Sequence, residues 1–215
     1  MDTIAEAAAP LAQWLAFLFA AIVLAFTPGP GMTYVVARTV AGGRAEGLAS
    51  CLGTALGGLV HVAAAAAGLS WLLAQSATAF TAVKLIGAAY LLWLGIRMLR
   101  AHRRSAVPRL AAAGARRALR DGAIVEMMNV KTALFFLAFI PQFVSPAFAP
   151  GWQFVVLGSV CVLLNTFADV IAVCTVDRLL ASDAGRSARA RALQLASGTT
   201  MIGLGVYVAL ARRPG

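Results

Sequence analysis

Residues 11–32 read LAQWLAFLFAAIVLAFTPGPGM, an apolar run that closes on a Thr-Pro-Gly-Pro-Gly string. The run before the string is almost long enough to cross a bilayer, whose hydrocarbon core takes about 20 helical residues. Because proline has no backbone N–H, Pro28 and Pro30 leave the carbonyls of Leu24 and Phe26 without their helical donors. The sequence therefore predicts a helix that breaks at the depth of the membrane.

Such a break creates sites for two kinds of charge. Gly29 and Gly31 supply the backbone freedom, and irregular backbone at this depth persists only where protein or a water-filled cavity covers it. The freed carbonyls carry partial negative charge, and the helix that resumes near Met32 presents its positive N-terminal end to the same place. The break thus offers one site for an ammonium group and one for a carboxylate. A kink that serves packing alone is the alternative.

The composition defines the class of protein. Apolar residues make up 61% and charged residues 12% of the 215, whereas about a quarter of the residues in a soluble domain are charged. Six apolar runs of spanning length lie at residues 11–28, 47–69, 77–99, 122–145, 152–175 and 193–211. They lack the alternation of barrel strands, so we predict an all-α membrane protein with six transmembrane helices in one domain, residues 1–215. The connections contain no phosphate-binding glycine loop, and we expect no cofactor.

The basic residues indicate how the chain is oriented. The net charge of +10 does not indicate nucleic acid binding, because the basic residues stand between apolar runs and not on one folded aqueous face. Cytoplasmic loops hold the excess of lysine and arginine. Fourteen of the eighteen basic residues fall on one side of this topology: Arg38, Arg44, Arg97, Arg100, Arg103, Arg104, Arg109, Arg116, Arg117, Arg120, Arg178, Arg186, Arg189 and Arg191. We therefore predict a cytoplasmic loop at residues 100–121 that touches anionic lipid headgroups, with both termini outside.

The six runs divide into two halves. Three spans followed by three more place the second half upside down relative to the first. We predict inverted three-helix repeats at residues 11–99 and 122–211, each opening with a helix that a polar or Pro/Gly segment interrupts; in the second half this segment is Asn-Val-Lys at residues 129–131. Gly53 and Gly57 form a GxxxG pair that lets helices approach closely. Such small-residue faces serve packing within one protomer or in a homodimer, and both readings stay open.

Lys131 and Glu126 are ionisable residues inside the fourth run. Lys131 lies roughly 14 Å of helix past the start of that run, near the middle of the bilayer. An ammonium group there is costly unless it is paired or solvated, so it marks a functional site by default. The two side chains are about 140° apart around a regular helix, and each is expected to face a different partner. We expect Lys131 to line a substrate cavity together with Asn129; a structural ion pair is the alternative.

Three groups are candidates for coupling to a proton gradient. Asp169 lies in the fifth run and Glu126 in the fourth, and a carboxyl group removed from water can exchange a proton near neutral pH. His61, in the second run, titrates in the same range. A neutral histidine that donates to a backbone carbonyl is the alternative for His61.

In the order and spacing of four segments, the chain resembles the LysE/RhtB family of amino-acid exporters. They are FTPGPG at 26–31, GRAEG at 43–47, KLIGAAYLLWLG at 84–95 and NVKTALFFLAFIPQF at 129–143. The resemblance implies a six-helix protein of the bacterial inner membrane that exports amino acids and related metabolites by proton antiport.

The sequence departs from the family pattern at three positions. The family's Asn-Pro-Lys motif has Val130 in its centre here, so an unbroken helix is an alternative for the second interruption. Gly31 stands where the family commonly has Asn or another polar residue, and Glu126 stands where a neutral residue is more usual. An added acid favours a substrate with an extra cationic group, or it serves as a proton carrier.

We therefore expect a secondary exporter of small amino acids or their derivatives that works by proton antiport with alternating access. The expected substrate site consists of Leu24, Phe26, Thr27, Pro28, Gly29, Pro30, Gly31, Met32, Glu126, Asn129 and Lys131. The alternatives are export of a metal ion or another organic cation and, from a different class, an intramembrane hydrolase. The sequence contains no Cys/His cluster that would support a metal exporter. It also contains no Gly-x-Ser-x-Gly elbow that would support a hydrolase.

Overall fold

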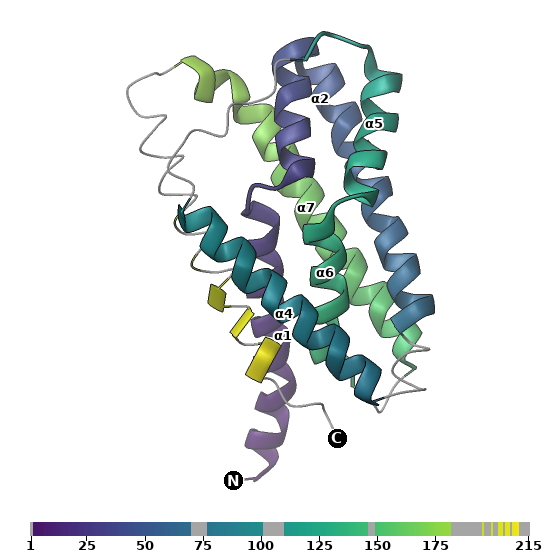
Figure 1. Ribbon diagram of the computed structural model, residues 1–215, viewed down its shortest axis with the longest axis vertical. Coiled ribbons are helices and arrows are strands. Elements are labelled where there is room, and N and C mark those ends of the chain that lie inside the picture. The colour runs from purple at the N-terminus through teal and green to yellow at the C-terminus, as the bar shows by residue number, and fades with distance from the viewer. Residues whose placement is uncertain are drawn as a thin grey trace.

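A computed structural model describes residues 2–69, 77–100, 110–145 and 149–181, together with residues 195, 199, 202, 203, 205, 206 and 208–210. Within these ranges every regular element is a helix (Figure 1). The expected sixth span, residues 193–211, lies largely outside the described part, as do the basic residues of the 101–109 and 182–191 segments. The all-α prediction is confirmed for the described residues.

The first two helices are separated by a short break, and the second of them bends into a helical hairpin. Helix α1, Asp2–Phe26, ends at the predicted break, and α2, Pro30–Ala64, begins directly after it. α2 folds back on itself at Gly43, whose φ of 74° is the left-handed conformation that glycine adopts at low cost. We call residues 30–42 the first arm and residues 44–64 the second arm; they run side by side in opposite directions (Figure 1).

This hairpin corrects two expectations. Residues 29–46 were expected to form a connection between spans, but most of them are helical, because α2 begins at Pro30. Arg38 was expected in a cytoplasmic loop, but it is only 5% exposed. The physical reason is that Arg38 finds buried acidic and carbonyl partners on other segments, so it faces the interior.

The remaining helices build the rest of the bundle. The short π-helix η1, Ala65–Leu69, follows α2, and α4, Ala77–Arg100, crosses the front of the view in Figure 1. α5, Ala115–Met127, and α6, Val130–Ala138, follow each other and lead into a 3-10 turn, η2, Ile140–Phe143. α7, Pro150–Ala181, extends past the expected end at residue 175.

The position of α5 corrects the expected loop at 100–121. Residues 115–121 are helical, because α5 is amphipathic and keeps Arg116, Arg117 and Arg120 outside while Ala118 and Gly122 pack inward.

Glycines allow α2 and α5 to pack closely. A Cβ atom on Gly53 would overlap the backbone carbonyl of Leu119, and one on Gly57 would lie 2.5 Å from the Ala123 carbonyl oxygen. From the other side, a Cβ on Gly122 would lie 2.9 Å from the carbonyl oxygen of Ser50. The predicted packing role of the Gly53/Gly57 pair is therefore confirmed, with α5 as the partner.

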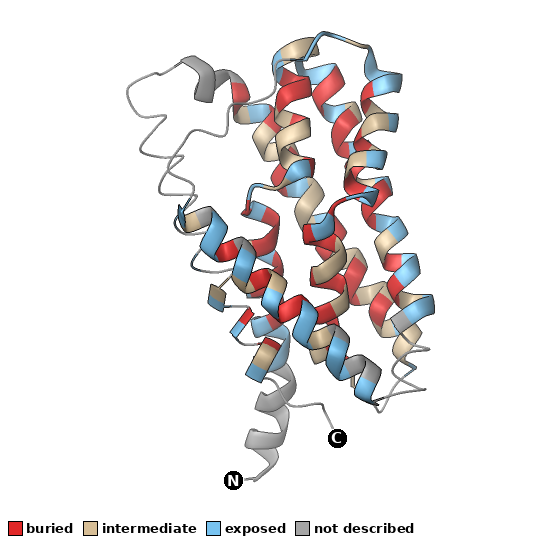
Figure 2. Ribbon diagram, viewed as in Figure 1, coloured by how far each residue is buried: buried red, intermediate tan, exposed pale blue. Residues whose placement is uncertain are grey.

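Burial follows the arrangement of a bundle in lipid. Buried residues face the centre, and large apolar side chains stay exposed on the outer faces (Figure 2); they include Leu15, Phe19, Leu52, Leu56, Leu163 and Phe167. Among the described residues, two helical segments pass as membrane spans by length and composition: Pro150–Val176 and Pro30–Gly68, although the latter includes the bend at Gly43. The bent pair of α5 with α6 and η2 makes a third if it is one span. An exposed apolar surface of this extent is suited to lipid and not to water.

Candidate functional site

The first break, residues 27–29, is made by the backbone. The Thr27 N–H still donates to the Val23 and Leu24 carbonyls, at 3.0 and 3.1 Å, and its hydroxyl donates to the Val23 carbonyl at 2.6 Å. Gly29 is extended and caps α2, and Pro30 occupies the first helical position, where its missing N–H costs nothing. α1 therefore ends and α2 begins within three residues, as the two prolines predict.

The second break, residues 128–129, persists without a proline. α5 and α6 meet at an angle of 46°. Asn129 produces this break: its side-chain oxygen accepts from the Lys131 N–H at 3.1 Å as an N-cap of α6, and its own N–H donates to the Glu126 carbonyl at 3.0 Å. The alternative of an unbroken helix is therefore wrong, because an asparagine cap replaces the proline.

Lys131 connects the two breaks. Its ammonium group donates to the Thr27 carbonyl at 2.8 Å and to the Leu24 carbonyl at 3.2 Å. Lys131 stands in the first turn of α6, where the helix dipole disfavours a cation, but its Nζ reaches the C-terminal end of α1, where the dipole favours one. The Leu24 carbonyl, which lacks its Pro28 donor and accepts from the Thr27 N–H, thus also holds a cation, as the sequence suggested, and that cation belongs to the protein.

Glu126 has the opposite arrangement. It lies in the last turn of α5, and its carboxylate reaches the start of α2, where a Cβ on Gly31 would overlap it. Asn129 donates to one carboxylate oxygen at 3.0 Å, and Thr132 donates to the other at 2.6 Å. Gly31 and Glu126 are therefore neighbours in space, and the missing side chain at position 31 leaves room for the carboxylate.

Glu126 and Lys131 do not pair with each other in an ion pair. Each faces a different partner, as their spacing predicted.

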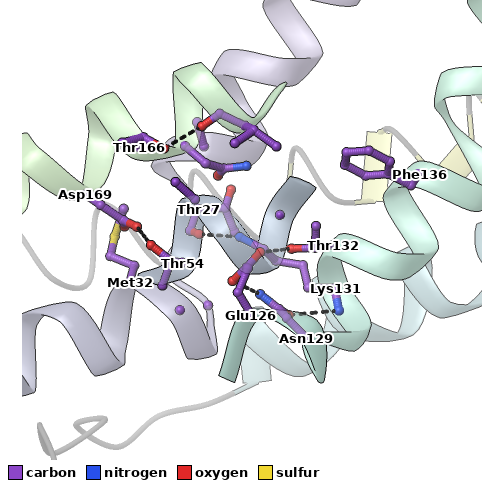
Figure 3. Close-up of a pocket in the computed structure, with 17 residues that line it drawn as sticks. Thr27, Met32, Thr54, Glu126, Asn129, Lys131, Thr132, Phe136, Thr166 and Asp169 are labelled. Atoms are coloured by element: carbon purple, nitrogen blue, oxygen red, sulfur yellow. Dashed lines mark hydrogen bonds between the residues drawn. The ribbon is translucent and has the colours of Figure 1, made fainter. Parts of the chain in front are cut away.

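Asp169 completes the ring of polar groups. It is buried on α7, and one of its oxygens accepts from the Thr54 hydroxyl at 3.0 Å (Figure 3). Asn165, one turn earlier on the same face of α7, lines the same cavity. α2, α5, α6 and α7 thus all place polar side chains around one point between the two breaks.

The cavity between these groups is small. A volume of about 20 Å³ lies within reach of the centre of a water molecule, which is room for one or two waters and far less than an amino acid needs. The lining residues are Ala25, Thr27, Gly29, Gly31, Met32, Thr54, Ala55, Gly58, Glu126, Asn129, Lys131, Thr132, Phe136, Val162, Asn165, Thr166 and Asp169. The polar groups therefore fill most of the space between the two breaks in this conformation.

The structure brings most of the expected site residues together. Thr27, Gly29, Gly31, Met32, Glu126, Asn129, Lys131 and Asp169 line the cavity. Leu24 does not line the cavity, but its carbonyl accepts from Lys131. Phe26, Pro28 and Pro30 do not line the cavity either, and they are exposed.

His61 stays outside the lining. Its Nε2 lies 2.9 Å from the Glu126 carbonyl oxygen. This contact is the backbone-carbonyl role that we kept as the alternative for His61.

Three threonines of the site were not predicted. Thr54 and Thr132 anchor the two acids, and Thr166 lines the wall with Asn165. Thr132 directly follows Lys131, and Thr166 lies three residues before Asp169, so nearness to intramembrane charges is a signal for both. Thr54 stands beside Gly53, but nothing in its sequence neighbourhood relates it to Asp169, 115 residues away.

A polar clip closes one end of the bundle. It consists of Arg38, Glu46, Asp121 and the backbone of residues 111–114. Arg38 lies 3.5 Å from a Glu46 oxygen and 3.8 Å from an Asp121 oxygen, and it donates to the Ala111 carbonyl. Glu46 accepts from the N–H groups of residues 113 and 114 at 2.8 and 2.7 Å. The clip joins the Gly43 bend to the segment before α5.

An aromatic cluster fills the bundle on the other side of the cavity. Phe135 and Phe139 stack with ring centres 4.6 Å apart, Phe143 lies 4.8 Å from Phe139, and Phe17 of α1 packs edge-on against Phe143 at 5.5 Å. Phe17, Phe135 and Phe139 are fully buried or nearly so. The bundle therefore has a polar cluster toward the Gly43 end and an aromatic cluster toward the opposite end.

A bundle of apolar helices in which two broken helices enclose a charged site defines a polytopic membrane protein with a buried polar centre. The comparison of whole sequences identifies it further. The chain belongs to the LysE type translocator family, whose sequence model matches residues 22–212.

Several curated proteins are similar over nearly the whole chain. A homoserine/homoserine lactone efflux protein of Salmonella typhimurium is 30% identical over 200 residues, which cover 93% of this chain and 97% of the relative. A leucine efflux protein of Klebsiella pneumoniae is 30% identical over 206 residues, 94% of this chain and 93% of the relative. An uncharacterized membrane protein of Vibrio cholerae is 34% identical over 153 residues, 71% and 75% of the two chains. No solved structure matches the chain.

Proposed function

We propose that this protein exports small amino acids or their derivatives across the bacterial inner membrane. The observation that carries the proposal is the meeting of two helix breaks around one cavity that contains a cation and two acids. Family membership and the efflux proteins among its relatives support it. A zwitterion needs both signs of charge in one small site, and this site offers both.

Each charged end of the substrate has candidate partners. The amino group would bind the Leu24 carbonyl or the carboxylates of Glu126 and Asp169. Asp169 accepts the Thr54 hydrogen bond on one oxygen and lines the cavity, so it has capacity for another donor. The substrate carboxylate would bind Lys131, whose ammonium has a third hydrogen beyond the two that its carbonyl bonds use.

Transport would proceed by alternating access. The small cavity would belong to a state without room for substrate, and the polar clip and the aromatic cluster would open in turn. In this proposal six helices form two inverted halves, residues 11–99 and 122–211, which rock about the two breaks. Because basic loops favour the cytoplasm, the Gly43 end would face inward and both termini outward.

Protons would drive export, with Asp169 as the first choice for the proton carrier and with Glu126 and His61 as further candidates. In proteoliposomes, Asp169→Asn should keep the exchange of substrate for substrate but lose the response of net export to a pH gradient. If Asp169→Asn responds to the gradient as the wild type does, the assignment to Asp169 is wrong. Glu126→Gln under the same protocol tests the second acid.

Counterflow tests the function itself. Sealed vesicles containing the purified protein are loaded with unlabelled leucine or homoserine, and uptake of the labelled compound is followed. We expect uptake above that of empty vesicles, and recovery of the compound unchanged. Chemical conversion of the compound would indicate an enzyme. No counterflow with any of the common amino acids or with homoserine would reject the proposal.

A further inference from the structure

The carbonyls of Leu24 and Thr27 form a cation site that the protein fills with its own ammonium group. Both oxygens lie within 3.2 Å of Lys131 Nζ, and the Lys131 side chain is only 8% exposed. The site exists because Pro28 provides no N–H for the Leu24 carbonyl and because α1 ends there. Any compact ammonium group of the same size would meet the same two acceptors.

The Lys131 ammonium group is held by these carbonyls and not by an ion pair. No carboxylate among the described residues lies within ion-pair distance of Nζ. Glu126 on α5 is bound to Asn129 and Thr132, Asp169 on α7 is bound to Thr54, and His61 on α2 contacts a backbone carbonyl. A cation that leaves the carbonyl pair therefore needs a new anion, because an unpaired charge in this interior is costly.

We propose that the Leu24–Thr27 carbonyl pair is the binding site for the substrate's amino group, and that Lys131 is its resident occupant until substrate arrives. This inference rests on the proposed function and deepens it. When the substrate ammonium takes the carbonyls, the displaced Lys131 ammonium pairs with the carboxylate of the same substrate. One positive charge occupies the carbonyls before and after, and the incoming negative charge neutralises the displaced one.

The geometry allows this exchange of partners. A lysine side chain is a flexible four-carbon stem with a rotatable ammonium head. Gly29 borders the stem: a Cβ there would lie 3.0 Å from both Cε and Nζ of Lys131, so any other residue would restrict its movement. Two ammonium groups cannot share the carbonyl pair, because like charges at such short range repel.

The exchange specifies the substrate class as a zwitterion recognised as a unit. An amine without a carboxylate would displace Lys131 and leave it without an anion. A carboxylate without an amine would pull Lys131 away and leave the carbonyls without a cation. Only a molecule with both groups on neighbouring atoms satisfies both halves of the site.

Binding of three matched probes to the purified protein tests this inference. L-leucine carries both groups, 3-methylbutylamine lacks the carboxylate and 4-methylpentanoate lacks the amine. In the wild type, leucine should bind at least about tenfold tighter than either fragment, since charged hydrogen bonds of this kind change affinity by that factor or more. In Lys131→Met the carbonyls have no resident cation, so the amine should bind about tenfold tighter than it does to the wild type, and leucine should lose its advantage over the amine. The same pattern is expected for homoserine and 3-aminopropanol.

Lys84→Met is the matched control, because it removes a lysine from α4 that does not line the cavity. The affinities of this variant for the three probes should equal those of the wild type.

A second measurement needs no variant. In the wild type, acetate should tighten the binding of 3-methylbutylamine, because it supplies the anion that the displaced Lys131 lacks. This measurement tests the exchange of partners even if Lys131→Met does not fold. Leucine counterflow by the wild type, together with an unchanged leucine-to-amine ratio in folded Lys131→Met or with no effect of acetate, would overturn the inference and leave the proposed function standing. No counterflow and no amino-acid binding by the wild type would instead overturn the proposed function.

Discussion

The two helix breaks have the same consequence but different chemistry. The first, at residues 27–29, results from the backbone, because two prolines flank an extended glycine. The second, at residues 128–129, depends on one side chain, since Asn129 caps α6 and also holds the carboxylate of Glu126. The first break supplies carbonyls, and the second carries the charged side chains that face them.

The difference teaches where each break is vulnerable. A backbone-made break tolerates the loss of one contributor, because the other proline and Gly29 remain. A side-chain-made break has one contributor, and its loss removes the helix cap and a partner of a buried acid together. Substitutions at the two breaks should therefore differ in cost.

The largest effect is expected for Asn129→Leu. Loss of the N-cap costs about 1 kcal/mol, and loss of a hydrogen bond to a buried carboxylate costs about 2 kcal/mol more. Unfolding by sodium dodecyl sulfate in mixed micelles, followed by tryptophan fluorescence, should show a destabilisation of about 3 kcal/mol. Asn129→Asp keeps the cap acceptor but cannot donate to Glu126, and it should keep the α6 cap while still losing stability. Equal stability of Asn129→Leu and wild type would show that the second break does not depend on this residue.

Gly57→Val should have the next largest effect, because the new side chain would push α5, which leads into the second break, away from α2, which begins at the first break. Its Cβ would lie 2.5 Å from the Ala123 carbonyl oxygen and 2.8 Å from Cβ of Glu126. Overpacking of this kind costs about 1–3 kcal/mol, measured in the same micelle titration, and transport should fall with it. Gly68→Val is the control, since nothing lies within 4 Å of its Cβ position. Similar losses in both variants would argue against the contact with α5.

A pair of substitutions tests the link between Gly31 and Glu126. Gly31→Asn places a side chain where the carboxylate of Glu126 lies, and it should destabilise the protein by about 1–2 kcal/mol. Adding Glu126→Ala makes room, so the double variant should recover part of the stability that Gly31→Asn loses. The sign of the coupling in this double-mutant cycle is the measurement, and additive losses would contradict the proposed spatial link.

The smallest effect on stability is expected for Pro28→Ala. The new N–H can bond to the Leu24 carbonyl and competes there with Lys131, but Pro30 and Gly29 still end the helix. The free energy of unfolding should change by less than about 1 kcal/mol, whereas the affinity for leucine should fall more clearly. A loss as large as that of Asn129→Leu would remove the contrast between the two breaks.

The sequence allowed much of the site to be predicted, for reasons that are local. Proline chemistry predicts the first break, and helical spacing predicts that Glu126 and Lys131 face different partners. The second break could not be predicted with certainty, because Asn129 can end a helix only if its side chain caps α6, and its orientation depends on whether the Glu126 carboxylate, three residues earlier, turns toward it.

Other features depend on contacts between distant segments. Arg38 was expected in a loop, because an arginine in a short connection between apolar runs is usually exposed, and its buried partners come from residues 46, 111 and 121. The fold-back at Gly43 has the same origin, since a GRAEG segment is compatible with a loop or a helix. Thr54 is recognisable as part of the site only after α2 and α7 are packed together.

The lysine seated on the Leu24 and Thr27 carbonyls has a consequence for the electrical state of a cell. A voltage acts across a living membrane, and an unfilled pair of carbonyls inside the bundle would give sodium or potassium a place to stop on the way across. Here a tethered positive group holds that place and cannot leave the chain. The resting protein is therefore expected to conduct no inorganic current, so that a cell can keep many copies of it without running down its ion gradients.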